Sequence, residues 1–195
     1  MKILLVAVNA KYIHSNLAVH TLNAYARRHV HRADMEIEVA EYTINQQQDD
    51  ILRNIYERAA DMICFSCYIW NMVYVEGLVR ELGKLCPNAV LWLGGPEVSY
   101  DAREVLIKLP EVKGVMKGEG ERTFAELCKG GLLCGTAGIT FRDEEGRIVE
   151  NEWRGPMELD EVPFIYEDME EFKNRIIYYE TSRGCPFSCS YCLSS

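Results

Sequence analysis

Three cysteines near the C-terminus carry the most specific chemical signal in the sequence. Cys185, Cys189 and Cys192 follow one another in the spacing CxxxCxxC. Three thiolates this close on one loop can hold one face of an iron-sulfur cluster. A structural zinc site normally takes four protein ligands, and neither a fourth cysteine nor a histidine lies nearby in the sequence. The pattern therefore favours a cluster with one open iron, at which a substrate or cofactor can bind.

The residues around these cysteines resemble a known family. The segment Thr-Ser-Arg-Gly-Cys-Pro-Phe-Ser-Cys-Ser-Tyr-Cys is similar to the end of the first barrel strand of the radical S-adenosylmethionine (radical SAM) enzymes. The resemblance implies that the three cysteines ligate a four-iron four-sulfur (4Fe-4S) cluster whose fourth iron chelates S-adenosylmethionine. It also implies that an electron donor drives cleavage of the sulfonium to a 5′-deoxyadenosyl radical. Tyr191 would then lie beside the adenine, and the alternative is that Tyr191 is an ordinary aromatic residue of the barrel core.

This resemblance covers only residues 176–195, which correspond to the first strand and loop of a barrel. We therefore expect the chain to be a fragment of a longer enzyme, with the remaining radical SAM barrel as its partner. A lone loop would leave a cluster exposed to solvent. For this reason we expect the 4Fe-4S cluster and S-adenosylmethionine to be absent from the truncated chain.

The other five cysteines carry no ligand pattern. They are Cys64, Cys67, Cys86, Cys128 and Cys134. A buried free thiol behaves as a small apolar side chain, so we expect these residues in the core. Cys64 and Cys67 form a CxxC pair on an apolar strand, where alternation directs them to opposite faces. A redox role for that pair is the alternative.

The elements that position these residues follow a regular alternation of strands and helices. Short apolar runs predict strands at residues 2–9, 62–66, 89–93 and 112–116, and alternation of apolar and charged residues predicts an edge strand at 35–42. Helical spacing predicts helices near residues 17–30, 49–60, 73–86, 102–109 and 121–129. Such alternation implies parallel strands joined by right-handed crossovers. We predict an α/β fold with a doubly wound, flavodoxin-like (Rossmann-like) five-stranded parallel sheet of order 2-1-3-4-5. Its ligand crevice would lie beyond the carboxyl ends of the strands.

The pattern changes after this domain. Residues 138–141 and 147–150 predict a small hairpin around an Asp-Glu-Glu-Gly turn, and an acidic stretch with two prolines then predicts a linker that crosses a surface. Residues 175–181 predict a new strand. We divide the chain into an α/β domain at residues 1–135, a hairpin and linker at 136–175, and the truncated start of a radical SAM domain, first strand included, at 176–195.

A doubly wound domain before a radical SAM loop resembles the cobalamin-binding domain of the cobalamin-dependent radical SAM family. Three short motifs at successive strand ends extend the resemblance: Ser66, Cys67 and Tyr68 after the third strand, Gly94, Gly95, Pro96 and Glu97 after the fourth, and Gly118, Glu119 and Gly120 after the fifth. In related domains a serine and a glycine pair border the slot for the nucleotide tail. Each glycine motif taken singly is also consistent with an ordinary strand-to-helix turn.

The first loop departs from the wider cobalamin family. The sequence contains no Asp-x-His, so the DxHxxG signature that supplies a histidine to cobalt is absent. His14 nevertheless lies in the loop that begins at Asn9, where the signature histidine would stand. Its imidazole would either ligate cobalt, line the lower corrin face or the barrel interface without a bond, or be an ordinary loop residue. We expect His20, His29 and His31 at the surface.

Composition excludes several other classes. The chain has 195 residues, 21 basic against 30 acidic side chains and a formal charge of −9, which would repel nucleic acid. Residues 150–175 alone carry nine acidic and three basic residues. No apolar run reaches the roughly 18 residues that span a bilayer, so we expect no membrane partner. Clustered cysteines without a secretion signal indicate a cytoplasmic protein with reduced thiols.

The favoured function is a cobalamin-binding module of a radical SAM enzyme, similar to the anaerobic magnesium-protoporphyrin ester cyclase and methylase group. The parent enzyme would then perform methyl transfer or oxidative cyclisation, and this fragment itself offers no catalytic residue. One alternative is a doubly wound interaction or substrate-docking domain that no longer binds cobalamin. A flavodoxin or receiver domain fits less well, because the first loop has neither a hydroxyl-rich phosphate cradle nor an acidic cluster.

Overall fold

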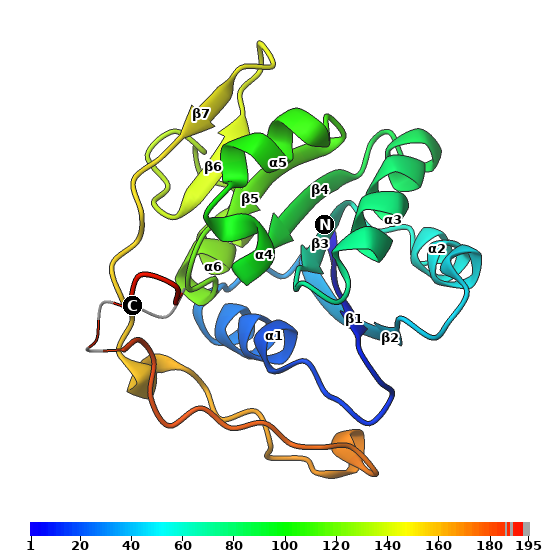
Figure 1. Cartoon of the computed structure of the whole chain (residues 1–195), viewed down its shortest axis with the longest axis vertical. Helices are drawn as coiled ribbons and strands as arrows, with labels where there is room; N and C mark the ends of the chain where they lie inside the picture. The colour runs from blue at the N-terminus through cyan, green and yellow to red at the C-terminus, as the bar shows by residue number, and fades with distance from the viewer. Residues whose placement is uncertain (186, 188, 193–195) are drawn as a thin grey trace.

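The computed structural model of the chain describes residues 1–185, 187 and 189–192. Its centre is a seven-stranded sheet of order β2-β1-β3-β4-β5-β6-β7 (Figure 1). The strands are β1 Lys2–Asn9, β2 Glu36–Thr43, β3 Met62–Ser66, β4 Val90–Gly94, β5 Val112–Met116, β6 Ile139–Arg142 and β7 Ile148–Glu150. The first five strands are parallel and follow the predicted order, which confirms the doubly wound fold.

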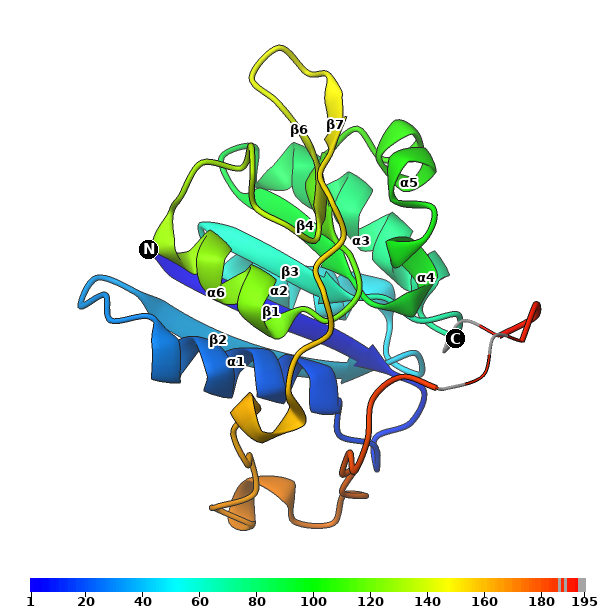
Figure 2. The ribbon, with the colours of Figure 1, turned by 90° about the vertical axis from the view of Figure 1, so that its left-hand side faces the viewer.

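Helices cover both faces of this sheet (Figures 1 and 2). They are α1 Leu17–His29, α2 Gln48–Glu57, α3 Met72–Leu85, α4 Pro96–Ser99, α5 Ala102–Lys108 and α6 Glu121–Lys129. Buried residues of α2, α3 and α5 share one apolar cluster, and those of α1 and α6 share another. All the predicted helices form, and the short α4 after β4 is an addition that the sequence analysis does not contain.

The central strand β1 explains why the sheet is easy to predict. Leu4, Val6 and Val8 belong to the cluster on the α3 face, whereas Ile3 and Leu5 belong to the cluster on the α1 face. A strand buried on both sides needs apolar residues at nearly every position, and β1 has this composition. Asn16 caps the start of α1, because its side-chain oxygen accepts the Val19 N–H at 3.3 Å.

The hairpin of β6 and β7 extends the main sheet. Strand β6 pairs antiparallel with β5, with Gly114 opposite Phe141 and Met116 opposite Ile139. Both β6 side chains are buried. The sequence predicts this hairpin after the five-stranded domain but does not predict its partner. Pairing removes the open edge that β5 would otherwise present, whereas β2 remains the edge strand that its alternating sequence predicts.

The chain after β7 passes α6 and α1 and then returns toward the carboxyl ends of the strands (Figures 1 and 2). Short 3-10 turns form at Leu159–Glu161 and Glu170–Phe172. The predicted barrel strand at 175–181 is wrong for this structure, because the segment contains only a single bridge between Ile176 and His14. A strand needs neighbouring strands for its backbone groups, and the β1–α1 loop pairs with this segment only at that bridge among the described residues.

Candidate functional site

The predicted motifs converge at the carboxyl ends of the parallel strands. Sheet register places Ser66 of β3 beside Ala7 of β1 on one side and Gly94 of β4 on the other. Gly94 in turn lies beside Met116 of β5. The loops that follow these strands therefore leave the sheet at one edge, which is where ligands bind in doubly wound folds.

The loop after β1 is held by a carboxylate that the sequence analysis does not identify. One oxygen of Glu41, on β2, accepts hydrogen bonds from the Asn9 side-chain amide at 3.0 Å and from the Asn16 N–H at 2.7 Å. The other oxygen lies 2.6 Å from Arg175 and 3.2 Å from the His20 ring. His20 is therefore half-buried, and its predicted place at the surface is wrong.

Burial and hydrogen bonding act against each other at Glu41. The side chain is 10% exposed, and burial on its own would raise the pKa of the carboxyl. Hydrogen bonds from His20, Asn9 and the Asn16 N–H outweigh burial, so the pKa lies below its ordinary value. Glu41 is therefore a stable anion that fixes the start of the loop. The Asn9 side chain serves the same loop, since its amide also donates to the His14 carbonyl at 3.1 Å.

His14 lies in the predicted loop, where it contacts residues 175–185, which we call the C-terminal segment. Its Nδ1 forms a hydrogen bond with the hydroxyl of Tyr178, and the two rings lie 5.9 Å apart. The backbone of the loop contacts the same segment, because the Ile176 N–H donates to the Ile13 carbonyl at 2.6 Å. The loop after β1 is thus an interface with residues 176–178.

The loop after β3 presents aromatic rings at the same edge. The Tyr68 ring stacks on Trp70 with 4.4 Å between centroids and 8° between planes. Trp70 is 45% exposed and Ile69 is more exposed still. Burial raises the pKa of the Tyr68 phenol, and the Ser66 hydroxyl opposes part of this increase. Ser66 itself is buried and accepts a long hydrogen bond, 3.4 Å, from Asn16.

The Asn71 side chain stabilises the loop after β3 through hydrogen bonds. Its side-chain amide donates to the carbonyls of Ser66 at 2.9 Å and Val8 at 3.1 Å, and its carbonyl oxygen accepts the Tyr68 N–H at 2.8 Å. The side chain is completely buried. Because these hydrogen bonds fix the backbone of the loop, they hold the stacked rings of Tyr68 and Trp70 in one arrangement.

Gly95 joins the loops after β3 and β4. Its φ is +109°, and a Cβ at this position would lie 2.4 Å from the carbonyl oxygen of Cys67. The Cys67 N–H donates to the Gly94 carbonyl at 2.7 Å, and the Glu97 N–H donates to the Cys67 carbonyl at 3.4 Å. Glycine is therefore required here by the close approach of two protein loops. Pro96 follows as the first residue of α4.

The five scattered cysteines are mostly structural, as predicted. Cys64 and Cys67 lie in the two opposite apolar clusters, which confirms that they point to opposite faces. Burial raises the pKa of the Cys67 thiol to about 12, so it stays neutral and unreactive. Cys128 is buried too, but Cys86 is only half-buried and Cys134 is exposed, so their predicted place in the core is wrong. Neither lies on an inward-facing strand position.

The turn after β5 also carries charged contacts. Glu119 accepts the Met157 N–H at 2.8 Å, and its carboxylate lies 3.6 Å from Arg183. Gly118 has a φ of +67°, which favours glycine, and a Cβ on Gly120 would lie 3.0 Å from Leu22. This turn therefore contacts α1, the linker and the C-terminal segment at once.

The three cysteines of the CxxxCxxC motif lie at the end of the described chain. Cys185 and Cys192 are exposed, Cys189 is half-buried, and none forms a disulfide. Among the described residues, no group of three histidine, cysteine, aspartate or glutamate side chains converges to hold a metal ion. Tyr191 is 89% exposed. The donor set fits an iron-sulfur cluster in its chemistry, because three thiols at this spacing, none of them in a disulfide, can each supply a thiolate ligand.

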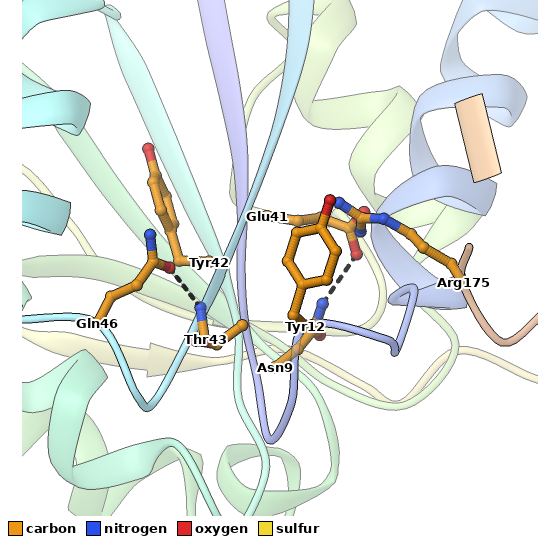
Figure 3. A pocket seen from close by; sticks show the side chains of 7 residues that line it. All are labelled: Asn9, Tyr12, Glu41, Tyr42, Thr43, Gln46 and Arg175. Carbon is orange, nitrogen blue, oxygen red and sulfur yellow. Dashed lines mark hydrogen bonds and ion pairs between the residues drawn. The ribbon is translucent and has the colours of Figure 1, made fainter. Parts of the chain in front are cut away.

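A cavity of about 210 Å³ opens beside Glu41 (Figure 3). Figure 3 shows Tyr12 and Arg175 on one side of it, next to Glu41, and Gln46 on the other side, turned toward Thr43. The Gln46 side chain accepts the Thr43 N–H at 2.7 Å, and the Arg175 guanidinium lies 5.3 Å from the Tyr12 ring. Pockets that enclose drug-sized ligands are roughly 300–1,000 Å³, so this cavity admits only a small group.

The loops at the carboxyl ends of the parallel strands form what we call the ligand edge. Together with the fold, this edge defines a cofactor-binding module of the doubly wound class. A family model described as the B12 binding domain matches residues 3–128, and the chain belongs to this family. It is a B12-binding module similar to the cobalamin domain of radical SAM methyltransferases, as the sequence motifs predict. No helix in the described part of the chain is long and apolar enough to cross a membrane.

The chain is also similar to individual proteins, among them a methyltransferase and a cyclase. The chain is 36% identical over 138 residues to the uncharacterized methyltransferase PH0819 of Pyrococcus horikoshii, covering 64% of this chain and 30% of that protein. It is 31% identical over 127 residues to the anaerobic magnesium-protoporphyrin IX monomethyl ester cyclase of Synechocystis, covering 59% and 25%. It therefore spans about a quarter to a third of these proteins' length.

A solved structure has the same fold over nearly the whole chain. The cobalamin-dependent S-adenosylmethionine radical enzyme OxsB, with aqua-cobalamin and S-adenosylmethionine bound, superposes with a TM-score of 0.77 at 22% identity. The match covers 98% of this chain and 28% of OxsB. The arrangement of strands and helices described above is thus the arrangement of a cobalamin-binding fold.

Proposed function

We propose that cobalamin binds across the carboxyl ends of β1, β3, β4 and β5, over the loops that contain Ser66, Gly94 and Gly118. The observation that carries this proposal is the convergence of these loops beside the Tyr68–Trp70 stack, in which the Trp70 ring is exposed. A large flat macrocycle gains most from rigid aromatic and main-chain surfaces of this kind. The cavity at Glu41 is too small to enclose it, so the cofactor lies on the open edge.

The residues at this edge divide into those that face the cofactor and those that support them. We assign the Ser66 hydroxyl, the main chain of Gly94, Gly95, Pro96 and Glu97, and the ring of Tyr68 to the cofactor. Cys67 holds the β3 loop to Gly94 through its backbone, and Asn9 holds the β1 loop to Glu41. Gly118, Glu119 and Gly120 form the border on the β5 side. Bound cobalamin supplies the cobalt chemistry, and these residues orient and shield it.

We assign His14 to the wall of this site without a bond to cobalt. Its Nδ1 is engaged with Tyr178, and its loop bridges Ile176. These contacts favour an interface role, one of the three alternatives open from the sequence. In His14→Ala we expect the visible spectrum of bound hydroxocobalamin to match that of the wild type. A shifted spectrum in the variant would assign the imidazole to cobalt instead.

We further propose that Cys185, Cys189 and Cys192 ligate a 4Fe-4S cluster in the parent enzyme, with Tyr191 beside S-adenosylmethionine. The CxxxCxxC spacing of these three thiols, none of which forms a disulfide, supports this role. With cluster and S-adenosylmethionine bound, the parent enzyme would have a source of one-electron radical chemistry for methyl transfer or oxidative cyclisation. It would need an electron donor and the rest of its barrel, which would begin at residue 176 after the α/β domain and linker. The lack of disulfides among the described cysteines also supports a reducing, cytoplasmic compartment.

The direct test is titration of the purified chain with hydroxocobalamin, followed by visible absorption. We expect saturable binding of one cofactor per chain. A domain that serves only interaction or substrate docking predicts no spectral change at any concentration, and this outcome would reject the proposal. Circular dichroism of the same sample separates loss of binding from loss of fold.

A further inference from the structure

Arg183 stands out because it is half-buried between exposed neighbours, Ser182 and Gly184, at the start of the cysteine loop. It precedes Cys185 by two positions, and its side chain is 15% exposed, whereas Cys185 is exposed. The guanidinium is surrounded by three carboxylates, those of Glu119, Glu121 and Glu180. An arginine so enclosed has given up much of its hydration, which requires compensating contacts.

The contact with Glu121 has the geometry of a strong ion pair. One guanidinium nitrogen of Arg183 lies 2.6 Å from Oε1 of Glu121, and a second lies 3.2 Å from Oε2. This two-point arrangement matches the planar fork of arginine and the planar carboxylate. The Glu121 side chain is only 5% exposed. In the described part of the chain, its recorded hydrogen bonds all come from Arg183.

The other two carboxylates show what this pair connects. Glu180 belongs to the C-terminal segment and accepts hydrogen bonds from Arg183 at 2.8 and 3.0 Å. Glu119 belongs to the turn after β5, which we assign to the border of the cobalamin site, and Glu121 follows this turn as the first residue of α6. One guanidinium therefore joins the approach to the cysteine loop with the turn at the ligand edge.

We propose that Arg183 is a positioning residue that fixes the start of the cysteine loop against the β5–α6 turn, and so sets how the cluster site faces the cobalamin site. This inference rests on the proposed role of the three cysteines. Lysine cannot replace Arg183 fully, since a single ammonium cannot hold Glu121 at two points while it also contacts Glu180. The proposal therefore predicts graded effects of Arg183→Lys and Arg183→Ala.

Hydrogen exchange measured by mass spectrometry on the cofactor-free chain tests the positioning role. In Arg183→Ala we expect amides of residues 180–185 and 118–121 to exchange about tenfold faster or more, because the only cation at Glu121 is lost. Arg183→Lys should give an intermediate rate. Amides of β1 should keep wild-type rates in both variants. The matched control is Arg122→Ala. Arg122 lies on α6 beside Glu121, and its ion pair with Glu161 is more exposed than the pair of Arg183 with Glu121.

Two results would overturn the proposal. One is exchange at residues 180–185 in Arg183→Ala no faster than in Arg122→Ala. The other is equal acceleration in β1, which would mean that Arg183 only contributes to global stability. Titration of the same proteins with hydroxocobalamin separates the two proposals. If the wild type fails to bind, the proposed function fails, while the exchange rates still decide whether Arg183 positions the loop.

Discussion

Two charged clusters tie the C-terminal segment to the sheet, and they are built in opposite ways. At the β1–α1 loop a single carboxylate, Glu41, faces the two basic side chains of His20 and Arg175. At the β5–α6 turn a single cation, Arg183, faces three carboxylates. Glu41 also receives donors from Asn9 and the Asn16 backbone. The first cluster is thus satisfied mainly from within the α/β domain, whereas the second depends on the C-terminal segment.

This difference indicates that the Glu41 cluster stabilises the α/β domain itself, whereas the Arg183 cluster orders the C-terminal segment. Glu41 lies inside the folded domain and organises a loop of the ligand edge, so its loss damages the domain itself. Arg183 lies on a segment that packs from outside, and that segment can separate while the sheet stays folded. Substitutions should therefore affect global stability at Glu41 and local order at Arg183.

The largest effect on global stability is expected for Glu41→Ala. The substitution leaves Arg175 without its carboxylate partner and leaves the buried Asn9 amide with only the His14 carbonyl, and breaking a buried pair of this kind costs about 3 kcal/mol. Urea unfolding monitored by circular dichroism measures the change. A loss below about 0.5 kcal/mol would contradict the central place of Glu41 in the domain.

A smaller loss is expected for Arg175→Ala. Glu41 then keeps its hydrogen bonds from His20, Asn9 and Asn16, so only one charge-assisted bond disappears. Such a bond contributes about 1.5 kcal/mol. Measured in the same urea series, a loss equal to that of Glu41→Ala would mean that the cluster depends on the C-terminal segment after all.

Acid should weaken the domain through Glu41. Its pKa in the folded chain lies below the ordinary value of 4.5, so the unfolded chain binds more protons in acid. The contribution of Glu41 to stability is therefore complete above about pH 4.5 and is lost as the pH falls through the folded-state pKa. The stability difference between wild type and Glu41→Gln should shrink over this range, and a difference that stays constant would refute the assignment.

The smallest global effect is expected for Arg183→Ala. Release of the C-terminal segment lets Glu121 regain water, so the unfolding free energy should change by less than about 1 kcal/mol. The urea midpoint and slope report this directly. A loss as large as that of Glu41→Ala would show that the segment is an integral part of the domain.

The sheet order was predictable from the sequence, because a strand buried on both faces needs an almost continuous apolar run. The motifs after β3, β4 and β5 were predictable as neighbours for a related reason, since parallel strands end at one edge. The strand predicted at residues 175–181 does not form, because strand formation depends on partner strands that a local pattern does not reveal. The position of the hairpin beside β5 was missed for the same reason.

The supporting polar residues carried only weak signals. Ile37, Val39 and Glu41 alternate onto one face of β2, and a carboxylate in this apolar series could have suggested a buried anion. Asn71 stands before an amphipathic helix and resembles an ordinary cap, although it makes no cap bond there. The role of Arg183 depends on residues 62 positions away, and no local spacing encodes such a contact.

The most direct test of the ligand edge compares two exposed aromatic residues, one near the carboxyl ends and one near the amino ends of the parallel strands. Trp70 follows β3 at the carboxyl edge, whereas Tyr56 lies near the end of α2, toward the amino ends of the strands. Hydroxocobalamin affinity is measured by absorption titration for wild type, Trp70→Ala and Tyr56→Ala. We predict about tenfold weaker binding for Trp70→Ala, from lost aromatic contact, and an unchanged affinity for Tyr56→Ala. Equal affinities in all three proteins, or weaker binding only in Tyr56→Ala, would contradict a cobalamin site at the carboxyl edge.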